Sequence, residues 1–589
     1  MENSYIIAID FGTAYSGYVF NITPSDEKPD PHLKKWGKEI GLDTPKTPTC
    51  ILFDESEEFV AFGYQATATY NCMRGETGKK HYFFQNFKMA LYGKELRRDM
   101  KIKAANGKEM TALKVFTEAL RFLKDDALKT ISSNAAGMVL LASDFTWVLT
   151  VPAIWDQSAK QFMREAAMEA GIVEKESEEK LVIALEPEAA SIWCKKLPSD
   201  GFIAEKHNGT SLDQRQGSQY IVVDCGGGTI DITVHEVLEG GALKELHKAS
   251  GNDLGGQTVD RKFKEFLREI FTDGVWDEYE EKYPSEIQRM MYDFTHLKQS
   301  GEDVQIPCPF NLGQVAQKKK NLEKFFESVK GASWNEGSIK ISKEKMRYFF
   351  EESVMGITGN LREILDKNYR IEYVLLVGGF ANSQILQQYI IDQFSDTCRI
   401  LCPFRAQEAI MRGAVEFGRK PSWVASRKSP YTYGVALCEP FDEIKHKPEK
   451  KFMIGEEEWC CDRFMTLVQA GEDVWWDEIR ELILRPVDKD QTCMVMRFYR
   501  TERIFPYYVD DLGVEEAGSF DVPMPNISEG RGRQVKLEIR FGSTEITATD
   551  TDTTSGSKGL IKFDFIRTDD PRCVEPYLYY SPDGKTLPE

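Results

Sequence analysis

Two short stretches of this chain share one pattern that could bind a polyphosphate. Residues 6–13 and 221–229 each hold an apolar run, an Asp, one further residue, Gly and a Thr. The apolar runs predict buried strands, and Gly lets backbone N–H groups approach an anion closely. Asp10 and Asp224 at the strand ends would face Mg²⁺ through water, because this ion keeps several of its waters. Thr13 and Thr229 would hold phosphate oxygens, together with the N–H groups of the neighbouring glycines. The alternative is that each Asp only caps its own turn, but two matching turns in one chain favour a shared nucleotide.

Bulk composition narrows the classes of partner. At 589 residues the chain is expected to form several domains, and a net charge of −19 argues against binding to nucleic acid or an anionic membrane. Residues 1–4 carry no basic leader, and no apolar run reaches the ~18 residues that span a bilayer. The 12 Cys form no Cys-x-x-Cys pair. We therefore expect a cytoplasmic protein, with the nucleus as the alternative, that is not secreted.

Strand and helix patterns alternate over the first 417 residues, which predicts an α/β architecture with internal sheets. A hairpin is expected over residues 1–20 and a second near 220, whereas residues 21–49, rich in Pro, Asp and Lys, are expected to form a loop. The remaining expected strands are 147–152, 181–185 and 373–377. The expected helices are 111–131, a segment ending at Gly171, 259–330, 343–367 and 384–394.

The pattern changes near residue 420. We predict a linker over 418–430, an antiparallel β domain over 431–570, and an irregular tail over 571–589. Within the β domain, apolar residues alternate from Val535 to Phe541, the period of a half-buried strand. Segments 545–548 and 560–563 are expected to pair across a turn.

Several motifs together resemble the actin, hexokinase and 70-kDa heat-shock superfamily. They are the two Asp hairpins, the turn at 186–190, and the Gly378-Gly379 step after a strand. Within the superfamily the chain is most similar to the 70-kDa heat-shock proteins, on segments 150–153, 254–260 and 408–414. The variants at 10–13 and 378–381 resemble the divergent "heat shock 70-kDa protein 12" branch. The resemblance is strong over 5–417 and weaker over 430–565.

This resemblance implies a two-lobed actin-like ATPase domain over 1–417, with duplicated ribonuclease-H-like sheets, followed by the smaller β domain. The implied cofactors are ATP or ADP and Mg²⁺. Lys88 would face the phosphates, Glu186 would orient the attacking water, and Asp231 would lie near the metal-bound waters, with Thr229 beside them. Each has an ordinary alternative, such as a surface Lys or an exposed carboxylate before Pro. The implied partners are the nucleotide and unfolded-peptide or protein clients.

The resemblance also implies the residues that contact the nucleotide, some at positions where this chain departs from the family. Ala14 stands where the family has a second Thr, and Leu297 where it has a stacking Arg. The full set is Gly12, Thr13, Ala14, Tyr15, Gly226, Gly227, Gly228, Thr229, Gly256, Asp293, His296, Leu297, Ser300, Gly378, Gly379, Phe380 and Asn382.

These observations favour a divergent heat-shock-70-like ATPase that couples its nucleotide state to the β domain. A second hypothesis is a nucleotide-binding scaffold or sensor with little or no hydrolysis, motivated by Ala14, Leu297 and the unusual linker. A third is a small-molecule kinase on the same superfamily fold, since fold alone does not decide the reaction.

Overall fold

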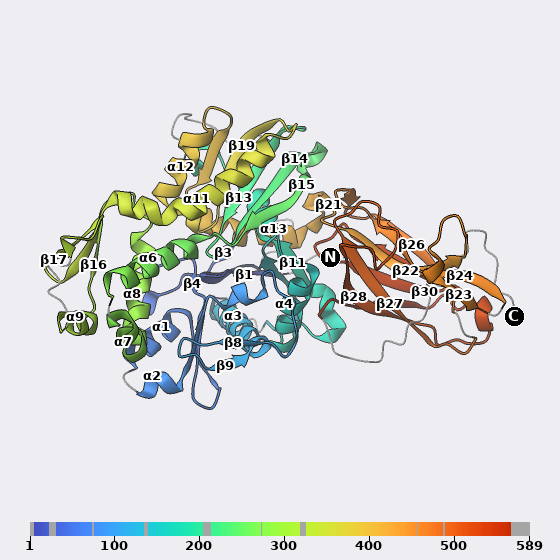
Figure 1. Cartoon of the computed structure of the whole chain (residues 1–589), viewed down its shortest axis with the longest axis horizontal. Helices are drawn as coiled ribbons and strands as arrows, with labels where there is room; N and C mark the ends of the chain where they lie inside the picture. The colour runs from blue at the N-terminus through green and yellow to red at the C-terminus, as the bar shows by residue number, and fades with distance from the viewer. Residues whose placement is uncertain are drawn as a thin grey trace.

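The computed structural model describes residues 5–22, 31–73, 76–134, 140–203, 212, 214–272, 274–318, 326–454, 456–486 and 489–566. The first four residues and the expected tail 571–589 lie outside this part of the chain. Figure 1 shows a larger α/β block on the left and a block of strands on the right, which contains most of the chain after residue 430.

The N-terminal sheet is built around the first hairpin. Its strand order is β11-β10-β1-β2-β3, and β4 pairs with β2. Strand β1 runs antiparallel to β2 and parallel to β10, which in turn runs parallel to β11. The strands are β1 (Tyr5–Phe11), β2 (Tyr15–Asn21), β3 (His32–Leu33), β4 (Thr47–Pro48), β10 (Phe145–Val151) and β11 (Leu181–Leu185).

The central sheet repeats this arrangement around the second hairpin. Its order is β12-β20-β19-β13-β14-β15-β21-β25, with β13 antiparallel to β14 and parallel to β19. Each sheet thus carries one Asp hairpin beside a parallel strand. The strands are β12 (Phe202–Ile203), β13 (Gln219–Cys225), β14 (Ile230–Val237), β15 (Leu243–Asn252), β19 (Ile371–Val377), β20 (Arg399–Pro403), β21 (Val424–Lys428) and β25 (Asp473–Trp475).

Two helices, α5 (Glu186–Cys194) and α13 (Ala406–Arg419), cross between the two sheets. Residues of both sheets and both helices form a single core cluster, which includes Ile6, Val222 and Leu375. Gly413 of α13 packs directly on α5: a Cβ there would overlap the Ala189 carbonyl oxygen. The crossing therefore fixes the start of α5, and with it Glu186, relative to both sheets.

Further helices cover the outer faces of the two sheets (Figure 1). Expected helices 343–367 and 384–394 correspond to α11 and α12. The helices are α1 (Gly63–Cys72), α2 (Glu76–Lys80), α3 (Ala112–Asn134), α4 (Gln157–Glu169), α6 (Gly256–Ile270), α7 (Val275–Lys282), α8 (Pro284–Leu297), α9 (Phe310–Gln317), α11 (Lys343–Leu365) and α12 (Gln384–Phe394).

The expected helical stretch 259–330 is wrong in its second half. Strand β16 (Val304–Pro307) interrupts it and pairs with β18 (Ser338–Ile341), which also pairs with β17 (Ala332–Asn335). Val304 and Ile306 are buried while their neighbours are exposed, which is the alternation of a half-buried strand. The strand was not expected because it is short and lies within a polar segment. Other small sheets consist of β5 (Cys50–Phe53), β6 (Phe59–Phe62) and β7 (Tyr82–Gln85), and of β8 (Lys101–Lys103) and β9 (Glu109–Thr111).

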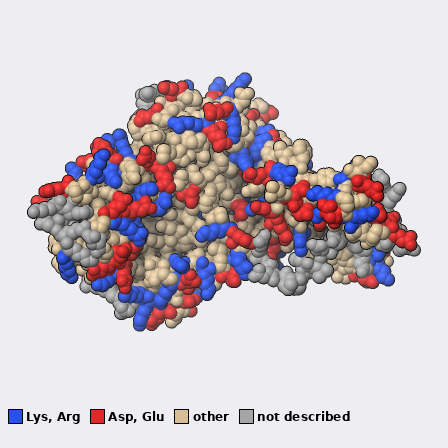
Figure 2. Space-filling model, in the orientation of Figure 1, with Lys and Arg blue, Asp and Glu red and all other residues tan. Residues whose placement is uncertain are grey.

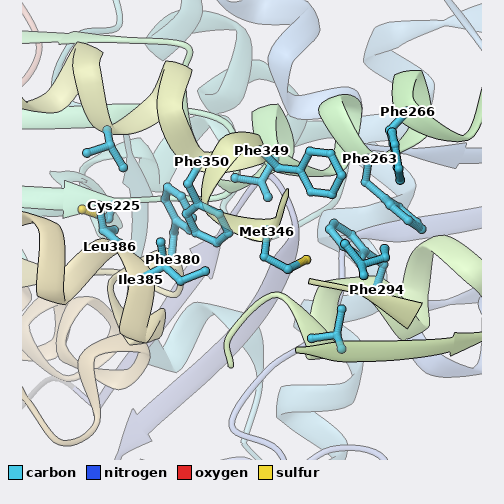
Figure 3. Packing of buried hydrophobic residues seen from close by; sticks show 14 of the residues in the cluster. Cys225, Phe263, Phe266, Phe294, Met346, Phe349, Phe350, Phe380, Ile385 and Leu386 are labelled. Carbon is cyan, nitrogen blue, oxygen red and sulfur yellow. The ribbon is translucent and has the colours of Figure 1, made fainter. Parts of the chain in front are cut away.

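Aromatic side chains fill the core below the central sheet (Figure 3). Phe263 stacks on Phe294 with 3.9 Å between ring centroids, and Phe350 stacks on Phe380 at 5.7 Å. Stacked pairs of this kind add to the stability gained by burial alone. The same packing holds Phe380 just after the Gly378-Gly379 step.

The chain after residue 430 forms two antiparallel sheets around their own core. Strands β30 and β31 do pair, but through residues 548–551 and 558–561, so the expected segments 545–548 and 560–563 share only Ala548, Leu560 and Ile561 with the observed pairing. The first sheet holds β22 (Thr432–Pro440), β23 (Lys451–Ile454), β24 (Glu457–Val468), β27 (Cys493–Thr501), β28 (Val514–Pro523) and β32 (Phe563–Asp564), and the second holds β26 (Ile479–Leu484), β29 (Val535–Arg540), β30 (Thr547–Asp552) and β31 (Lys558–Ile561).

The expected linker 418–430 differs from the structure. Helix α13 continues to Arg419, and β21 then joins the central sheet between β15 and β25. The central sheet therefore ends in β25, a strand from the chain after residue 430 that belongs to neither of the two C-terminal sheets. Strand β21 was not expected from the sequence because it has few apolar residues and lies between Lys and Pro residues.

We predict that Gly413→Ala destabilises the fold through the α5–α13 crossing. Overpacking of this kind costs ~1–3 kcal/mol, because a backbone atom must move. Gly359→Ala in α11 is the matched control: it is exposed and a Cβ there meets nothing within 4 Å. It should stabilise by ~0.5–1 kcal/mol. Chemical denaturation of both variants tests this, and an unchanged midpoint for Gly413→Ala would contradict the crossing.

Candidate functional site

The two glycine turns after β1 and β13 face each other across a narrow gap. A Cβ on Gly227 would lie 2.7 Å from the Ala14 Cβ, and one on Gly228 would lie 2.8 Å from the Thr13 Oγ1. Such distances leave no room for a side chain, so both positions require Gly. The structure thus brings the two distant sequence motifs into one cleft.

In the second turn the carbonyl groups are held from behind by the start of α6. Gly256 N donates to Gly226 O at 3.1 Å, and Gln257 N donates to Gly227 O at 2.8 Å. The N–H of a trans peptide points opposite to its C=O. The N–H groups of Gly227 and Gly228 therefore point away from α6, and they are available to an anion in the cleft.

In the first turn Thr49 has the same role. Its N–H donates to Ala14 O at 2.8 Å, and its Oγ1 donates to Gly12 O at 2.7 Å. By the same peptide geometry, the N–H groups of Thr13 and Tyr15 point away from Thr49. Ala14 thus contributes backbone to the turn, although it lacks the hydroxyl that the resemblance would place there.

Asp10 at the end of β1 is buried and has a partner on each oxygen. Thr150 Oγ1 donates to Asp10 Oδ1 at 3.0 Å, and Lys46 Nζ lies 2.5 Å from Asp10 Oδ2. Thr150 reaches it because the two residues are register partners in the parallel pair β1–β10. Lys46 was missed by the sequence analysis, because it lies in the segment expected to be a loop.

Asp224 occupies the matching position in the central sheet but lacks such partners. Neither of its carboxylate oxygens has a hydrogen-bond partner among the described residues. Its register partners are Val377, which cannot donate from its side chain, and Asp231, a second buried acid. Burial raises the pKa of Asp224 well above its usual range, and the carboxylates of Glu186 and Asp231 raise it further.

Lys88 and Glu186 form a buried ion pair between these turns. Lys88 Nζ lies 2.7 Å from Glu186 Oε1, and it also lies 5.1 Å from the centre of the Trp155 ring. Burial raises the pKa of Glu186 to about 7, while Lys88 opposes that rise. A carboxylate with a pKa near neutrality is typical of functional sites.

Asp231 and Thr229 follow the second turn and are also buried. Asp231 Oδ1 accepts a hydrogen bond from Ile154 N at 2.9 Å, whereas Oδ2 has no partner among the described residues. Burial raises the pKa of Asp231. One oxygen of Asp231 therefore remains available inside the cleft.

The charges in this cleft fit a hydrated divalent cation. Four buried carboxylates lie here, on Asp10, Glu186, Asp224 and Asp231, against the ammonium groups of Lys46 and Lys88. Within the described ranges, no three His, Cys, Asp or Glu side chains converge as a direct metal-ligand set. The orphaned oxygens of Asp224 and Asp231 can accept hydrogen bonds from metal-bound water, which is the coordination that Mg²⁺ favours.

The Gly378-Gly379 step closes the cleft from the central sheet. Gly378 has a φ of +88°, and a Cβ there would overlap Asp224 Oδ1, so this position also requires Gly. The turn η7 (Phe380–Asn382) follows, and the buried ring of Phe380 lies 3.3 Å from where a Cβ on Gly256 would be. These residues line one end of the site together.

The residues expected on α8 are not brought together with this end. The helix face that lines the cleft carries Gln288, Met291, Tyr292 and Thr295, spaced three or four residues apart. Asp293, His296 and Leu297 fall on other faces of α8, where His296 is exposed and Leu297 packs on the core, and Ser300 lies beyond the end of the helix. Their expected contacts with a nucleotide stay a prediction.

Lys298 is a buried basic residue near Gly256 that the sequence analysis did not single out. Its Nζ donates to Gly256 O at 2.6 Å and pairs with Asp260 at 2.7 Å. It lies one residue past the end of α8 and is buried. The helical spacing of the residues over 287–295 that line the cleft is the sequence signal that could have drawn attention to Lys298.

The open part of the cleft has a volume of about 680 Å³. Its lining includes Ala14, Tyr15 and Gly228 from the two turns, together with Met89 next to Lys88. A volume of this size is in the range of small-molecule sites. It opens toward α1, α6 and α8 rather than toward the C-terminal sheets.

Comparisons with known proteins agree with this geometry. The family profile described as "Hsp70 protein" matches residues 45–415. The chain is 33% identical to "Heat shock 70 kDa protein 12A" of Mus musculus, over 95% of this chain and 91% of that protein. It is 32% identical to "Heat shock 70 kDa protein 12B" of Homo sapiens, over 96% and 91%. A "Chaperone protein DnaK" of Mycoplasmopsis synoviae is 26% identical, over 50% and 43%.

The surface and the helices add two further observations. On the face shown in Figure 2, acidic and basic side chains are interspersed over both blocks. Among the described residues, the model contains no helix with the length and apolarity needed to cross a bilayer. The expected absence of nucleic-acid and membrane partners remains a prediction.

We predict opposite stability effects for the two motif aspartates. Asp10→Asn breaks the buried pair with Lys46 and should lower the free energy of unfolding by ~3–5 kcal/mol. Asp224→Asn replaces a buried carboxyl group without partners and should leave stability unchanged or raise it by ~1–2 kcal/mol. Urea denaturation of the nucleotide-free protein near pH 7 measures both. Equal losses in the two variants would contradict the asymmetry.

Proposed function

This chain belongs to the Hsp70 family, in the branch of the heat shock 70 kDa protein 12 relatives, and on that premise we propose that it binds Mg-ATP between its two sheets and hydrolyses it to ADP. The observation that carries the proposal is the pair of facing turns, with Gly227 within contact distance of Ala14. Their outward N–H groups and the surplus of buried carboxylates suit a triphosphate and a hydrated Mg²⁺. The two sheets would act as two lobes that close on the nucleotide.

Each polar group of the cleft receives a role in this proposal. Bound Mg²⁺ would supply positive charge at the phosphate oxygens. Lys88 would neutralise charge that develops on the terminal phosphate, and the Glu186 carboxylate would orient the attacking water. Asp224 and Asp231 would hold metal-bound waters through their unpaired oxygens. Phe380 and the Gly378-Gly379 step would contact the nucleoside.

A second candidate is a nucleotide sensor with little or no hydrolysis. Two observations favour it: Ala14 supplies no hydroxyl to the phosphates, and Lys46 already occupies one oxygen of Asp10. Both features weaken the positioning on which phosphoryl transfer depends. In this case the nucleotide would stabilise the closed arrangement without being turned over.

The C-terminal sheets would respond to the nucleotide through a buried contact. Arg427 of β21 makes a bidentate pair with Glu188, at 2.8 Å to each oxygen, and donates to Gly542 O between β29 and β30. Glu188 lies in the first turn of α5, two residues after Glu186. A shift of α5 on nucleotide binding would therefore reach the loop before β30 directly.

The same loop is anchored on the N-terminal sheet. Thr544 Oγ1 donates to Ile183 O at 2.7 Å, Lys160 Nζ donates to Thr544 O at 2.9 Å, and Arg164 pairs with Glu545 at 2.6 Å. The loop thus contacts both sheets that flank the cleft. We propose that the C-terminal sheets form a domain that reports lobe closure and binds extended peptide clients by strand addition, for which β23 offers an edge.

We also propose the cytoplasm as the compartment, with the nucleus as the alternative. Eleven described cysteines stand outside any disulfide, seven of them buried, including Cys194, Cys225 and Cys402. Unpaired thiols persist in reducing compartments.

Hydrolysis is tested by single-turnover release of phosphate from bound ATP. Lys88→Met and Glu186→Gln should each slow release by about 100-fold or more, because charge neutralisation and water orientation are lost, while ATP still binds. Lys34→Met is the control, since Lys34 pairs with Asp126 outside the cleft. Tight binding without release by the unmodified protein would favour the sensor, and transfer of phosphate to a small acceptor would favour a kinase.

Coupling is tested by hydrogen exchange in β29 and β30 with and without nucleotide. In the unmodified protein we expect nucleotide to change exchange in these strands. Arg427→Met should reduce that change several-fold, because Glu188 loses its link to the loop; Glu188→Gln is a milder second variant. Lys562→Ala, which removes an exposed pair with Glu178, should leave it intact. An identical response in all four proteins would refute this route.

A further inference from the structure

The two halves of the phosphate site are not equivalent in charge. Asp10 and Asp224 end matching strands in matching hairpins. Across the hairpin, the residue opposite Asp10 is Gly17, whereas the residue opposite Asp224 is Asp231. The first carboxylate therefore lies beside an open space and the second beside another carboxylate.

Lys46 fills the space next to Asp10. Strand β4 pairs with β2 through Ser16 and Thr47, so the preceding residue of β4 lies next to Gly17. A Cβ on Gly17 would lie 3.1 Å from Lys46 Cγ and 2.8 Å from Pro45 O. Only Gly at this position leaves the Lys46 stem a straight path to Asp10.

The ion pair of Lys46 and Asp10 is almost fully buried. The Lys46 side chain is 10% exposed and that of Asp10 is 2% exposed. The second Asp10 oxygen accepts a hydrogen bond from Thr150, so both oxygens have a donor. At the matching place in the central sheet, Val377 stands opposite Asp224 and offers no side-chain donor. Among the described residues of the two hairpins, the buried carboxylate oxygens without a partner belong to Asp224 and Asp231 of the central half.

The Lys46 ammonium next to Asp10 places a positive charge where a metal ion would approach this carboxylate. A hydrated divalent cation bridging the two hairpins would approach a positive group at short range in a buried site, where like charges repel strongly. At the same time the ammonium supplies one positive charge to a phosphate held by the first turn, with no metal required.

We propose that Lys46 serves as a built-in cation of the nucleotide site, so that this protein binds nucleoside polyphosphate with little dependence on Mg²⁺. The proposal rests on the proposed nucleotide function and extends it. Lys46 takes the place of metal-bound water at Asp10, and any Mg²⁺ that binds is held from the side of Asp224 and Asp231 alone.

The first test compares the Kd of ADP in excess Mg²⁺ and in excess EDTA by isothermal titration calorimetry, on the full chain. For the unmodified protein we expect the two values to agree within about threefold. Lys46→Met should need Mg²⁺, with ADP binding about tenfold weaker in EDTA, a coupling of ordinary size for two ligands. Lys46→Arg, which keeps the charge, should restore the unmodified ratio. Lys34→Met, which breaks the Asp126 pair, should not change it.

The second test uses Mg²⁺ alone on the nucleotide-free protein. Lys46→Met should bind Mg²⁺ about tenfold more tightly than the unmodified protein, because the competing positive charge is removed. This readout is independent of hydrolysis and of nucleotide.

The outcomes separate cleanly. If ADP binding by the unmodified protein weakens more than tenfold in EDTA, the proposal is overturned, and this measurement decides the matter even if Lys46→Met does not fold. A Lys46→Met protein with a lower melting temperature but an unchanged Mg²⁺ ratio also overturns it, since the pair would then be structural only. If neither ATP nor ADP binds under any condition, the proposed function itself has failed.

Discussion

The architecture of this protein depends on the close approach of two glycine turns from different sheets. Gly227 and Gly228 lie so near Ala14 and Thr13 that a side chain at either position would push the sheets apart. The carbonyl oxygens of each turn are engaged from behind, by Thr49 in one and by the start of α6 in the other. Backbone geometry then directs N–H groups into the space between the turns. A binding site for an anion follows from main-chain packing, before any charged side chain is considered.

Charge is the second constraint. Burying carboxylates is costly, and the elevated pKa of Asp224 and of Glu186 expresses that cost in this cleft. The chain compensates with two lysines whose positions are fixed by neighbouring elements, Lys46 by β4 and Lys88 by the turn η2 (Phe87–Leu91). The buried negative charge that no lysine neutralises lies on the side of the central sheet. A cation in the cleft would therefore be favoured at the second hairpin.

The sequence was informative where a motif and a strand coincided. The two hairpins, the strand before Gly378 and the start of α5 were predictable because an apolar run followed by Asp, Glu or Gly reports both burial and a turn. Lys46 was not predictable, since its partner depends on the pairing of a two-residue strand inside a polar segment. The residues expected on α8 lie off the helix face that lines the cavity, and a shift of one or two residues along a helix rotates a side chain by 100° or more. The resemblance predicted which helix lines the cleft, whereas the face that it turns to the cleft depends on how the helix packs.

The segment between α13 and β22 is packed into the fold and does not form a free linker. A free linker would let the C-terminal sheets move independently, whereas β21 is hydrogen-bonded into the central sheet and carries Arg427 into the gap beside α5. One short segment therefore contacts the central sheet, the helix that begins at Glu186, and the loop before β30. Because the pair of Arg427 and Glu188 is buried, breaking it separates two opposite charges without exposing them to water. Any rearrangement of α5 must then move the loop as well or separate a buried charge pair, and the first alternative costs less. The C-terminal sheets are in this way mechanically linked to the helix that begins at Glu186.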